Sequence, residues 1–505
     1  MGVLRFSMNP QEYLQTTDFS YRQQWGQFFT PPVVADFMVE WLLRKPCETL
    51  FDPAFGLGAL ATAAWQRNPK IRVQGMEICP KILDAWKKGE KAGFAEVCQG
   101  DYLLHWGAAR DAIVCNPPYQ RFQHFRNRGE VFSLFEQHLG IRLSGYTNMA
   151  SAFLVKSVSE LCVGGRLAYL MPLEFLNTGY GVPVKRFLTQ QGKIVALGKL
   201  RCETEVFPEV MTTVGILFFE KGKRSGKTIF YNLSSLSDLS KAFRQGTAWG
   251  GLTPEKKWEP FFQNRRPATV TAGWIPLREW GTFQRGIATG ANAFFTMNEE
   301  ERKGRGLSRR EVIPCVTKSR QMTQPVLLPE DVKRLQKANA AIFLLHPQEP
   351  LSRNMRRYLQ EGEAQGIPRR FLTRHRHPWY RQERKEPAPI WIGVFSRQGY
   401  RVVRNLTNTR HLTCYHGFYP NEEGKKHIDA LFLFWMSRTG RETILQQMRS
   451  YGNGLYKLEP GDLNAIWIPG KNFWKRWSPQ EIAQEMTYVR QHGQLSQEAE
   501  TKFND

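Results

Sequence analysis

The stretch FDPAFGLG occupies residues 51–58 and decides the fold that we expect for the first half of the chain. It joins an apolar segment ending at Asp52 to the helix-like segment ALATAAW, which follows Gly58. Glycine has no Cβ, so Gly56 and Gly58 allow the backbone to approach a bound nucleotide closely. The turn also directs the free N–H groups of the following helix toward a ligand. Taken alone, such a turn is weak evidence for a nucleotide site, because glycine-rich strand–helix turns are common.

Acidic residues at the ends of the next two apolar segments strengthen this interpretation. Glu77 ends the segment IRVQGME, where a carboxylate can accept hydrogen bonds from both hydroxyls of a ribose. Asp101 and Tyr102 follow the third segment, in the sequence GDYL. A carboxylate there can accept a hydrogen bond from an exocyclic amine, and the aromatic ring can cover an adenine. The three strand ends together therefore predict a nucleoside site.

Apolar and helix-like segments alternate through the first half of the chain. Seven short apolar segments between residues 48 and 220 have the composition of strands, and most gaps between them have the pattern of helices. This alternation predicts an α/β fold with a doubly wound, largely parallel sheet, similar to a Rossmann fold. We expect one domain over residues 1–222.

The rest of the chain changes in character three times. Residues 223–275 are polar and rich in Ser, Gly, Lys and Pro, so we expect an irregular connector. A second module begins near residue 276, and we expect a mixed α+β domain over residues 276–490. Residues 491–505 are polar, and we expect a frayed tail.

The segment DAIVCNPPY, residues 111–119, is the strongest indication of chemistry in the chain. Pro117 and Pro118 lack backbone N–H groups, so this turn presents carbonyl oxygens that can only accept hydrogen bonds. Asn116 adds a side-chain carbonyl, and together these groups can accept both hydrogens of an exocyclic –NH2. That arrangement draws the nitrogen lone pair out of conjugation and directs it at a methyl donor. Tyr119 offers a flat face on which a base can stack.

Composition limits the class of protein. The formal net charge is +24 and the pI is about 9.8, which favours a polyanionic partner such as nucleic acid. No apolar run is long enough for a membrane span and no signal peptide is recognisable, so we expect no membrane partner. The eight Cys include no Cys-x-x-Cys pair, which predicts neither a zinc site nor a disulfide framework and suits a reducing cytoplasm. We expect no bound metal.

The most basic part of the second module covers residues 351–410, which contain fourteen Lys and Arg against four Glu. Arg predominates over Lys, and the Arg side chains lie among aromatic residues, as suits bidentate contacts with phosphate or guanine. A solvated charged face would look similar. We select as candidate DNA-binding residues Arg374, Arg376, Arg381, Arg397, Arg401 and Arg404.

These motifs resemble those of DNA methyltransferases that methylate exocyclic amines. The segment GQFFTPP at residues 26–32 is similar to the G-x-[FYV]-x-T-P-P segment that precedes the glycine loop in the gamma-ordered, TaqI-like subgroup. The order of residues 26–32, 52–58 and 116–119, followed by a basic C-terminal half, also resembles that subgroup. The segments RGIATGANAFF, HPWY and NGLYKL are similar to recognition domains of Eco57I-type methylases. The resemblance implies an S-adenosylmethionine-dependent enzyme that methylates the N6 amino group of adenine in double-stranded DNA.

The resemblance also implies roles for individual residues in holding the cofactor. Thr30 would contact the methionine part of S-adenosylmethionine, Glu77 the ribose and Asp101 the adenine amine. The cofactor-binding set that it implies is Thr30, Asp52, Pro53, Ala54, Phe55, Gly56, Gly58, Glu77, Ile78, Asp101, Tyr102 and Pro118.

The target base would be held by a second group of residues. Asn116 and Pro117 would accept hydrogen bonds from the target amine, and Tyr119 would stack on the flipped base. A Phe on the last strand contacts the flipped adenine in TaqI-like enzymes. Phe219 matches that position by spacing, with Phe218 as an alternative because a slip of one residue changes the face of the strand.

Other acceptors of the methyl group stay open. The Asn-Pro-Pro-Tyr motif also occurs in methyltransferases acting on release-factor glutamine and on rRNA guanine, but those chains are shorter. Cytosine N4 is a closer alternative, although it usually goes with Ser in place of Asn116. A non-catalytic DNA-binding protein would not need the acids and the Asn-Pro-Pro-Tyr motif together. We expect the modification component of a restriction–modification system, acting as a monomer on DNA, with any restriction endonuclease in a separate chain.

Overall fold

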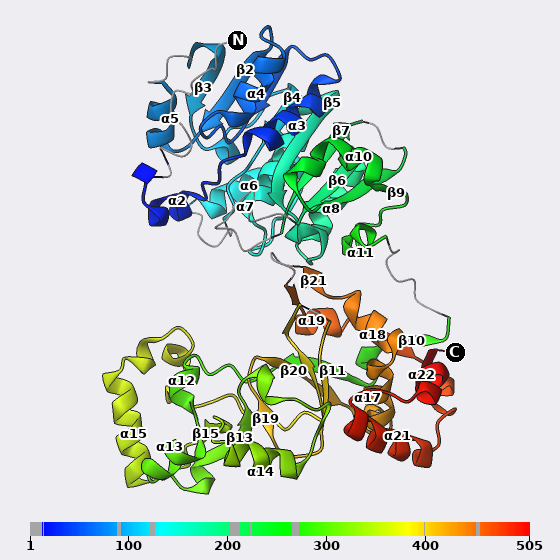
Figure 1. Cartoon of the computed structure of the whole chain (residues 1–505). Coiled ribbons are helices and arrows are strands. Elements are labelled where there is room, and N and C mark those ends of the chain that lie inside the picture. Colours follow the sequence, from blue (N-terminus) through cyan, green and yellow to red (C-terminus); the bar gives the residue numbers. More distant parts are fainter. Residues whose placement is uncertain are drawn as a thin grey trace. The chain divides into compact units, whose positions relative to one another are not determined.

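The computed structural model describes residue 13 and residues 15–87, 92–120, 127–201, 213–222, 225–264, 272–397, 399–450 and 455–504. The chain divides into two compact units, which are coloured from blue to green and from green to red in Figure 1. Met1–Pro267 belongs to the first unit, and Ala268–Arg449 with Leu455–Asp505 forms the second.

A nine-stranded sheet forms the centre of the first unit, in the order β3-β2-β1-β4-β5-β7-β6-β8-β9. The first five strands of that order are parallel, and β7 is antiparallel to both of its neighbours. All seven predicted strands are present, so the expected doubly wound α/β fold is confirmed. Their bounds are β1 Thr49–Asp52, β2 Arg72–Glu77, β3 Ala95–Gln99, β4 Arg110–Cys115, β5 Leu161–Pro172, β6 Gly192–Leu200 and β7 Val214–Lys221.

Helices cover both faces of this sheet and bury a separate core on each (Figure 1). Along β4, Ile113 and Cys115 point into one core while Ala112 and Val114 point into the other, as the period of two in a strand requires. One core is covered by α6 (Arg128–Leu139), α7 (Met149–Glu160) and α8 (Gly181–Gln191). The other is covered by α3 (Pro32–Leu43), α4 (Ala59–Arg67) and α5 (Pro80–Lys87). Strands that are buried on both faces explain the nearly continuous apolar runs in the sequence.

The strand order brings the functional motifs to one edge of the sheet. β1 lies between β2 and β4, so the chain leaves β1 in one direction and later returns on its other side. Such a reversal opens a crevice outside the carboxyl ends of the strands, where α/β proteins bind ligands. Asp52, Glu77 and Asn116 lie at or just beyond the carboxyl ends of these three adjacent strands.

The segment 223–275 differs from the irregular connector that we expected. β8 (Thr228–Leu233) pairs with β6, and β9 (Thr247–Trp249) pairs with β8, so both strands extend the sheet. Phe230 lies in the core with two Phe residues of α11 (Glu259–Phe262). The two strands are short and lie between polar turns. The composition of the whole segment is therefore polar, although the strands themselves are partly apolar.

The second unit has a mixed α+β fold, as expected. Its five-stranded sheet has the order β11-β20-β16-β18-β14, with bounds Gly281–Arg285, Tyr415–Pro420, Ile390–Gly393, Val402–Asn405 and Val326–Leu327. A smaller four-stranded sheet has the order β12-β15-β13-β19, with bounds Thr296–Met297, Phe343–Leu345, Val312–Val316 and Arg410–His411. α17 (Ile428–Met436) and α21 (Pro479–His492) contribute to the largest core of this unit.

The expected frayed tail at residues 491–505 is wrong. The chain forms α22 (Gln497–Asn504), and Phe503 is only 1% exposed. Its ring stacks on Trp477 with 4.3 Å between the ring centroids. Two apolar side chains, Ala499 and Phe503 at a spacing of four, are enough to bury one face of this short and mostly polar helix.

Candidate active site

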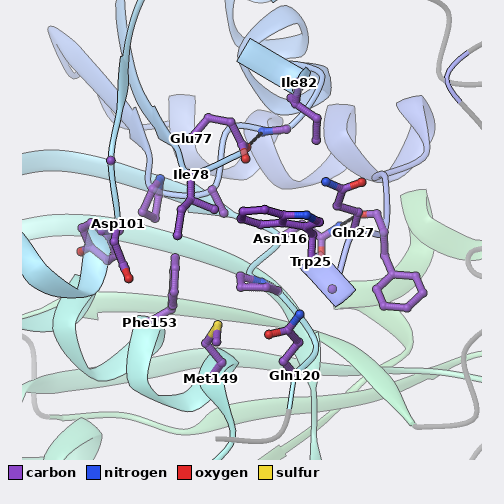
Figure 2. Close-up of a pocket in the computed structure, with 18 of the residues that line it drawn as sticks. Trp25, Gln27, Glu77, Ile78, Ile82, Asp101, Asn116, Gln120, Met149 and Phe153 are labelled. Carbon is purple, nitrogen blue, oxygen red and sulfur yellow. Dashed lines mark hydrogen bonds between the residues drawn. The ribbon is translucent and has the colours of Figure 1, made fainter. Parts of the chain in front are cut away.

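A pocket of about 340 Å³ opens at the carboxyl edge of the sheet in the first unit (Figure 2). Most of the residues predicted to bind a nucleoside meet there. Those that line it are Pro53, Ala54, Gly56, Glu77, Ile78, Asp101, Tyr102, Asn116 and Pro118. The fold thus brings together predicted residues that lie far apart along the chain.

Glu77 holds the glycine loop in place. One carboxylate oxygen accepts a hydrogen bond from the Gly56 N–H at 2.8 Å, and the other accepts one from the Cys79 N–H at 2.8 Å. Gly56 has φ +57°, a conformation that favours glycine. Burial raises the pKa of Glu77 above its ordinary value. Each carboxylate oxygen has a second lone pair, so Glu77 can brace the loop and still accept a bond from a ribose hydroxyl.

Four of the predicted cofactor residues do not line the pocket. Asp52 is buried beneath the loop, where it accepts a hydrogen bond from the Ala54 N–H at 3.1 Å, and burial raises its pKa to about 8. Phe55 packs on Trp86, and a Cβ at Gly58 would lie 2.6 Å from the Trp86 ring. These three residues shape the loop from behind. Thr30, the fourth, is buried beside Asn116.

Ile78 and Phe153 face each other across the pocket, with Asp101 beside them (Figure 2). The gap between an aliphatic and an aromatic side chain suits a flat purine ring. Asp101 accepts a hydrogen bond from the Leu103 N–H at 3.0 Å, and burial raises the pKa of its carboxyl group. Sequence reasoning missed Phe153, because its place in the pattern of α7 made it one of many apolar helix residues.

Tyr102 lines the pocket as predicted, and that its ring covers an adenine stays a prediction. Its hydroxyl donates a hydrogen bond to Glu160 at 2.6 Å, and the Lys156 ammonium lies 3.7 Å from the centre of its ring. Lys156 and Glu160 form a buried ion pair on α7, and burial lowers the pKa of Lys156 to about 8. Tyr102 reaches the wall of the pocket, but these contacts fix its ring against α7.

Asn116 is oriented by two hydrogen bonds that its amide nitrogen donates. Nδ2 donates to the carbonyl oxygen of Phe28 at 2.6 Å and to the Thr30 hydroxyl oxygen at 3.1 Å. The opposite atom, Oδ1, is buried and has no hydrogen-bond partner within the described part of the chain. A buried acceptor without a donor costs free energy, so this oxygen is prepared to accept a hydrogen bond from a ligand.

The residues around Asn116 are closely packed. Gly26 has φ +63°, and a Cβ there would lie 3.2 Å from the Pro118 side chain, so only glycine fits without strain. The Tyr119 ring stacks on Phe28 with 5.3 Å between centroids, and its hydroxyl donates to the Leu170 carbonyl oxygen at 3.2 Å. Tyr119 therefore lies beside the pocket, with Phe28 against its ring. That it stacks on a base stays a prediction.

Phe219 is not a contact for the target base. It is fully buried, and its backbone pairs with Leu167 of β5 and Ile194 of β6. β7 runs antiparallel to β5, so its first residue, Val214, lies at the edge with Pro172, and Phe219 lies deep in the sheet. Phe218 is also fully buried. Both are core residues.

The six candidate Arg side chains of the second unit fall into two groups. Arg404 is buried and forms an ion pair with Asp429 at 2.6 Å, so its selection as a DNA contact was wrong. Arg376 donates to the carbonyl oxygens of Ala288 and Thr289, and Arg401 to those of Ser319 and Met322. These guanidinium groups hold the fold together. The exposed side chains are Arg374, Arg381, Arg397 and also Arg401, whose guanidinium makes these backbone contacts at the surface.

The pocket fits S-adenosylmethionine. Ile78 and Phe153 would flank the adenine, and Glu77 would hold the ribose. Gln27 lines the pocket, and its buried Nε2 has no acceptor within the described residues, so it can donate to the carboxylate of the methionine part. Trp25 also reaches into the pocket from the N-terminal segment (Figure 2). Gln27 lies inside the segment GQFFTPP, which could have identified it; Trp25 lies just before it.

Within the residues that the structure describes, neither a metal site nor a membrane-spanning helix is found. No group of three or more His, Cys, Asp or Glu among the residues that the structure describes could hold a metal ion. In the same part of the chain, every helix is too short or too polar to cross a membrane.

Comparison with known proteins identifies the family. The chain is 33% identical over 470 residues to the Type II methyltransferase M.AccI of Acinetobacter calcoaceticus, covering 90% of this chain and 87% of that protein. The chain belongs to the type II methyltransferases of restriction–modification systems. The family description "Eco57I restriction-modification methylase" matches residues 81–207 of this methyltransferase, and "Type II methyltransferase M.Eco57I, C-terminal domain" matches residues 266–500.

A second relative agrees with this assignment, and a solved structure shares the fold. The methyltransferase is 26% identical over 463 residues to the Type II methyltransferase M.XamI of Xanthomonas campestris pv. amaranthicola, covering 88% of this chain and 85% of that protein. Its fold is similar to that of the Type IIL restriction–modification enzyme MmeI, solved in complex with DNA, with a TM-score of 0.64. That likeness covers 99% of this chain and 77% of the MmeI chain at 12% sequence identity.

Replacing Thr30 by Val tests how Asn116 is oriented. The variant loses one of the two acceptors for Nδ2, so we expect the rate of methyl transfer to fall roughly tenfold while the Kd for S-adenosylmethionine is unchanged. Single-turnover kinetics and a cofactor titration measure the two quantities. Thr30→Ser keeps the hydroxyl and should behave like the wild type. Weaker cofactor binding at an unchanged rate would instead assign Thr30 to the cofactor.

Replacing Glu77 by Gln tests the predicted ribose contact. The variant loses the charge that strengthens a hydrogen bond from a ribose hydroxyl, so we expect cofactor binding to weaken by about 1.5–3 kcal/mol. Isothermal titration calorimetry measures this change. Glu96→Gln, at an exposed position on β3, is the matched control and should bind normally. An unchanged affinity in Glu77→Gln would contradict the assignment.

Proposed function

We propose that this DNA methyltransferase transfers the methyl group of S-adenosylmethionine to the N6 amino group of an adenine that is flipped out of double-stranded DNA. The proposal rests on the buried Oδ1 of Asn116, which has no hydrogen-bond partner among the described residues. An exocyclic amine needs such an acceptor, whereas a ring nitrogen or a ring carbon would not use one. Adenine fits the Asn-Pro-Pro-Tyr form of the motif, since cytosine-N4 enzymes usually have Ser in place of Asn116.

The reaction needs little more than placement. The target base must leave the duplex, because its amine is not accessible within the stack. Asn116 Oδ1 accepts one amine hydrogen, and the backbone carbonyl oxygen of Pro117 accepts the other. The nitrogen then carries a lone pair directed at the electrophile, and the positive charge that builds on it is stabilised by both acceptors.

S-adenosylmethionine supplies the methyl group on a sulfonium centre. The amine nitrogen forms the new N–C bond as the S–C bond breaks, and the amine loses one proton to solvent after the transfer. No covalent intermediate on the chain is needed. Cys115 is fully buried and burial raises the pKa of its thiol well above the ordinary value, so it is not a nucleophile.

The second unit would read the DNA sequence. The strongly positive charge of the chain supports binding to duplex DNA, as does the fold it shares with an enzyme solved in complex with DNA. We further propose that the chain acts as a monomer on DNA in the cytoplasm, with a restriction endonuclease in a separate chain.

Single-molecule modification sequencing tests the proposed function. Plasmid DNA from a methylation-deficient host that expresses the chain should contain N6-methyladenine at one short sequence motif. Asn116→Ala should remove the modification, although the purified variant should still bind S-adenosylmethionine. N4-methylcytosine at the motif would contradict the adenine assignment. Unmodified DNA from cells containing active protein would direct attention to RNA and release-factor substrates.

A further inference from the structure

Phe371 is an exposed aromatic side chain at the centre of the most basic loop of the second unit. It is 70% exposed, between η9 (Ile367–Arg369) and η10 (Thr373–His375). A single exposed Phe is ordinary on a protein surface, so exposure alone means little. Its surroundings are what point to a function.

The positive charge around Phe371 is complementary to the negative charge of a nucleic-acid backbone. Residues 367–384 contain six Arg and one Glu. The guanidinium of Arg374 lies 5.1 Å from the centre of the Phe371 ring, and the His375 ring lies 5.4 Å away. The exposed Arg side chains of the loop are Arg369, Arg370, Arg374, Arg381 and Arg384. They provide positive charge close to the apolar ring, as contacts to phosphates beside an inserted side chain would require.

The loop is held rigidly from beneath. Thr373 is fully buried, and its hydroxyl donates to the carbonyl oxygens of Ile367 and Arg370. Arg376 fastens the next residues to the carbonyl oxygens of Ala288 and Thr289. Nδ1 of His375 donates to the Phe371 carbonyl oxygen at 2.7 Å. The backbone that presents Phe371 is therefore ordered before any partner binds, which lowers the entropic cost of binding.

We propose that Phe371 is a wedge that inserts between base pairs of the substrate DNA and unstacks one base step. Apolar wedges of this kind distort a duplex and increase the protein surface that it contacts. The exposed Arg side chains of the loop would contact the phosphates on either side of the opened step. This inference rests on the proposed function only in taking duplex DNA as the substrate.

Fluorescence of 2-aminopurine tests the wedge. The base analogue is placed at successive positions of a duplex that contains the recognition sequence, always outside the methylated base, and each duplex is saturated with protein. We expect enhanced fluorescence at one step with the wild type and no enhancement there with Phe371→Ala. The Ala variant should also bind the duplex about tenfold more weakly, since one stacking contact is lost.

Two variants provide controls. Phe371→Leu should retain the enhancement, because an aliphatic side chain can also act as a wedge. Phe395→Ala removes another exposed Phe of the second unit, one that has the Lys457 ammonium 5.5 Å from its ring, and should retain it too. No enhancement with the wild type, or enhancement that persists in Phe371→Ala, would overturn the proposal. The readout is base stacking, so it does not depend on which base is methylated.

Discussion

The proposed chemistry depends on the orientation of one amide group, that of Asn116. Asn116 has both donors engaged, on the Phe28 carbonyl oxygen and the Thr30 hydroxyl, so a flip of its side chain would lose the bond to Phe28 and set two carbonyl oxygens against each other. The consequence is a buried oxygen, on a residue that lines the pocket, with no donor among the residues that the structure describes. This unsatisfied acceptor lowers the stability of the folded chain, and a hydrogen bond from a substrate amine would offset that loss on binding.

The same edge of the sheet couples this acceptor to the cofactor pocket. β1 lies between β2 and β4, so the glycine loop, Glu77 and Asn116 occupy neighbouring strand ends. Glu77 ties the loop to β2 through the Gly56 N–H, while Gly26 brings the N-terminal segment against Pro118. These short connections mean that methyl donor and target amine would meet at a fixed separation, which is the main requirement for an in-line transfer.

The sequence predicted what depends on periodicity and on short motifs. The seven strands of the first unit are runs of apolar residues buried on both sides, and the residues at their carboxyl ends converge because parallel strands share one edge. The predictions that failed depended on what a side chain touches. Phe219 and Arg404 had suitable chemistry, but one is buried in the sheet core and the other is paired with Asp429. Other contacts were simply not predictable: Tyr102 lines the pocket as expected, but its hydrogen bond to Glu160 of α7 joins residues more than fifty positions apart, so no local pattern could reveal it.

The most direct test of this account is a crystal structure of the chain with a non-reactive S-adenosylmethionine analogue and a duplex containing its recognition sequence. We expect Asn116 Oδ1 to accept a hydrogen bond, at about 2.9 Å, from N6 of a flipped adenine, with Nδ2 still bound to Phe28 and Thr30. An Asn116 amide that has turned away from the base, or a target amine held by other residues, would contradict the account.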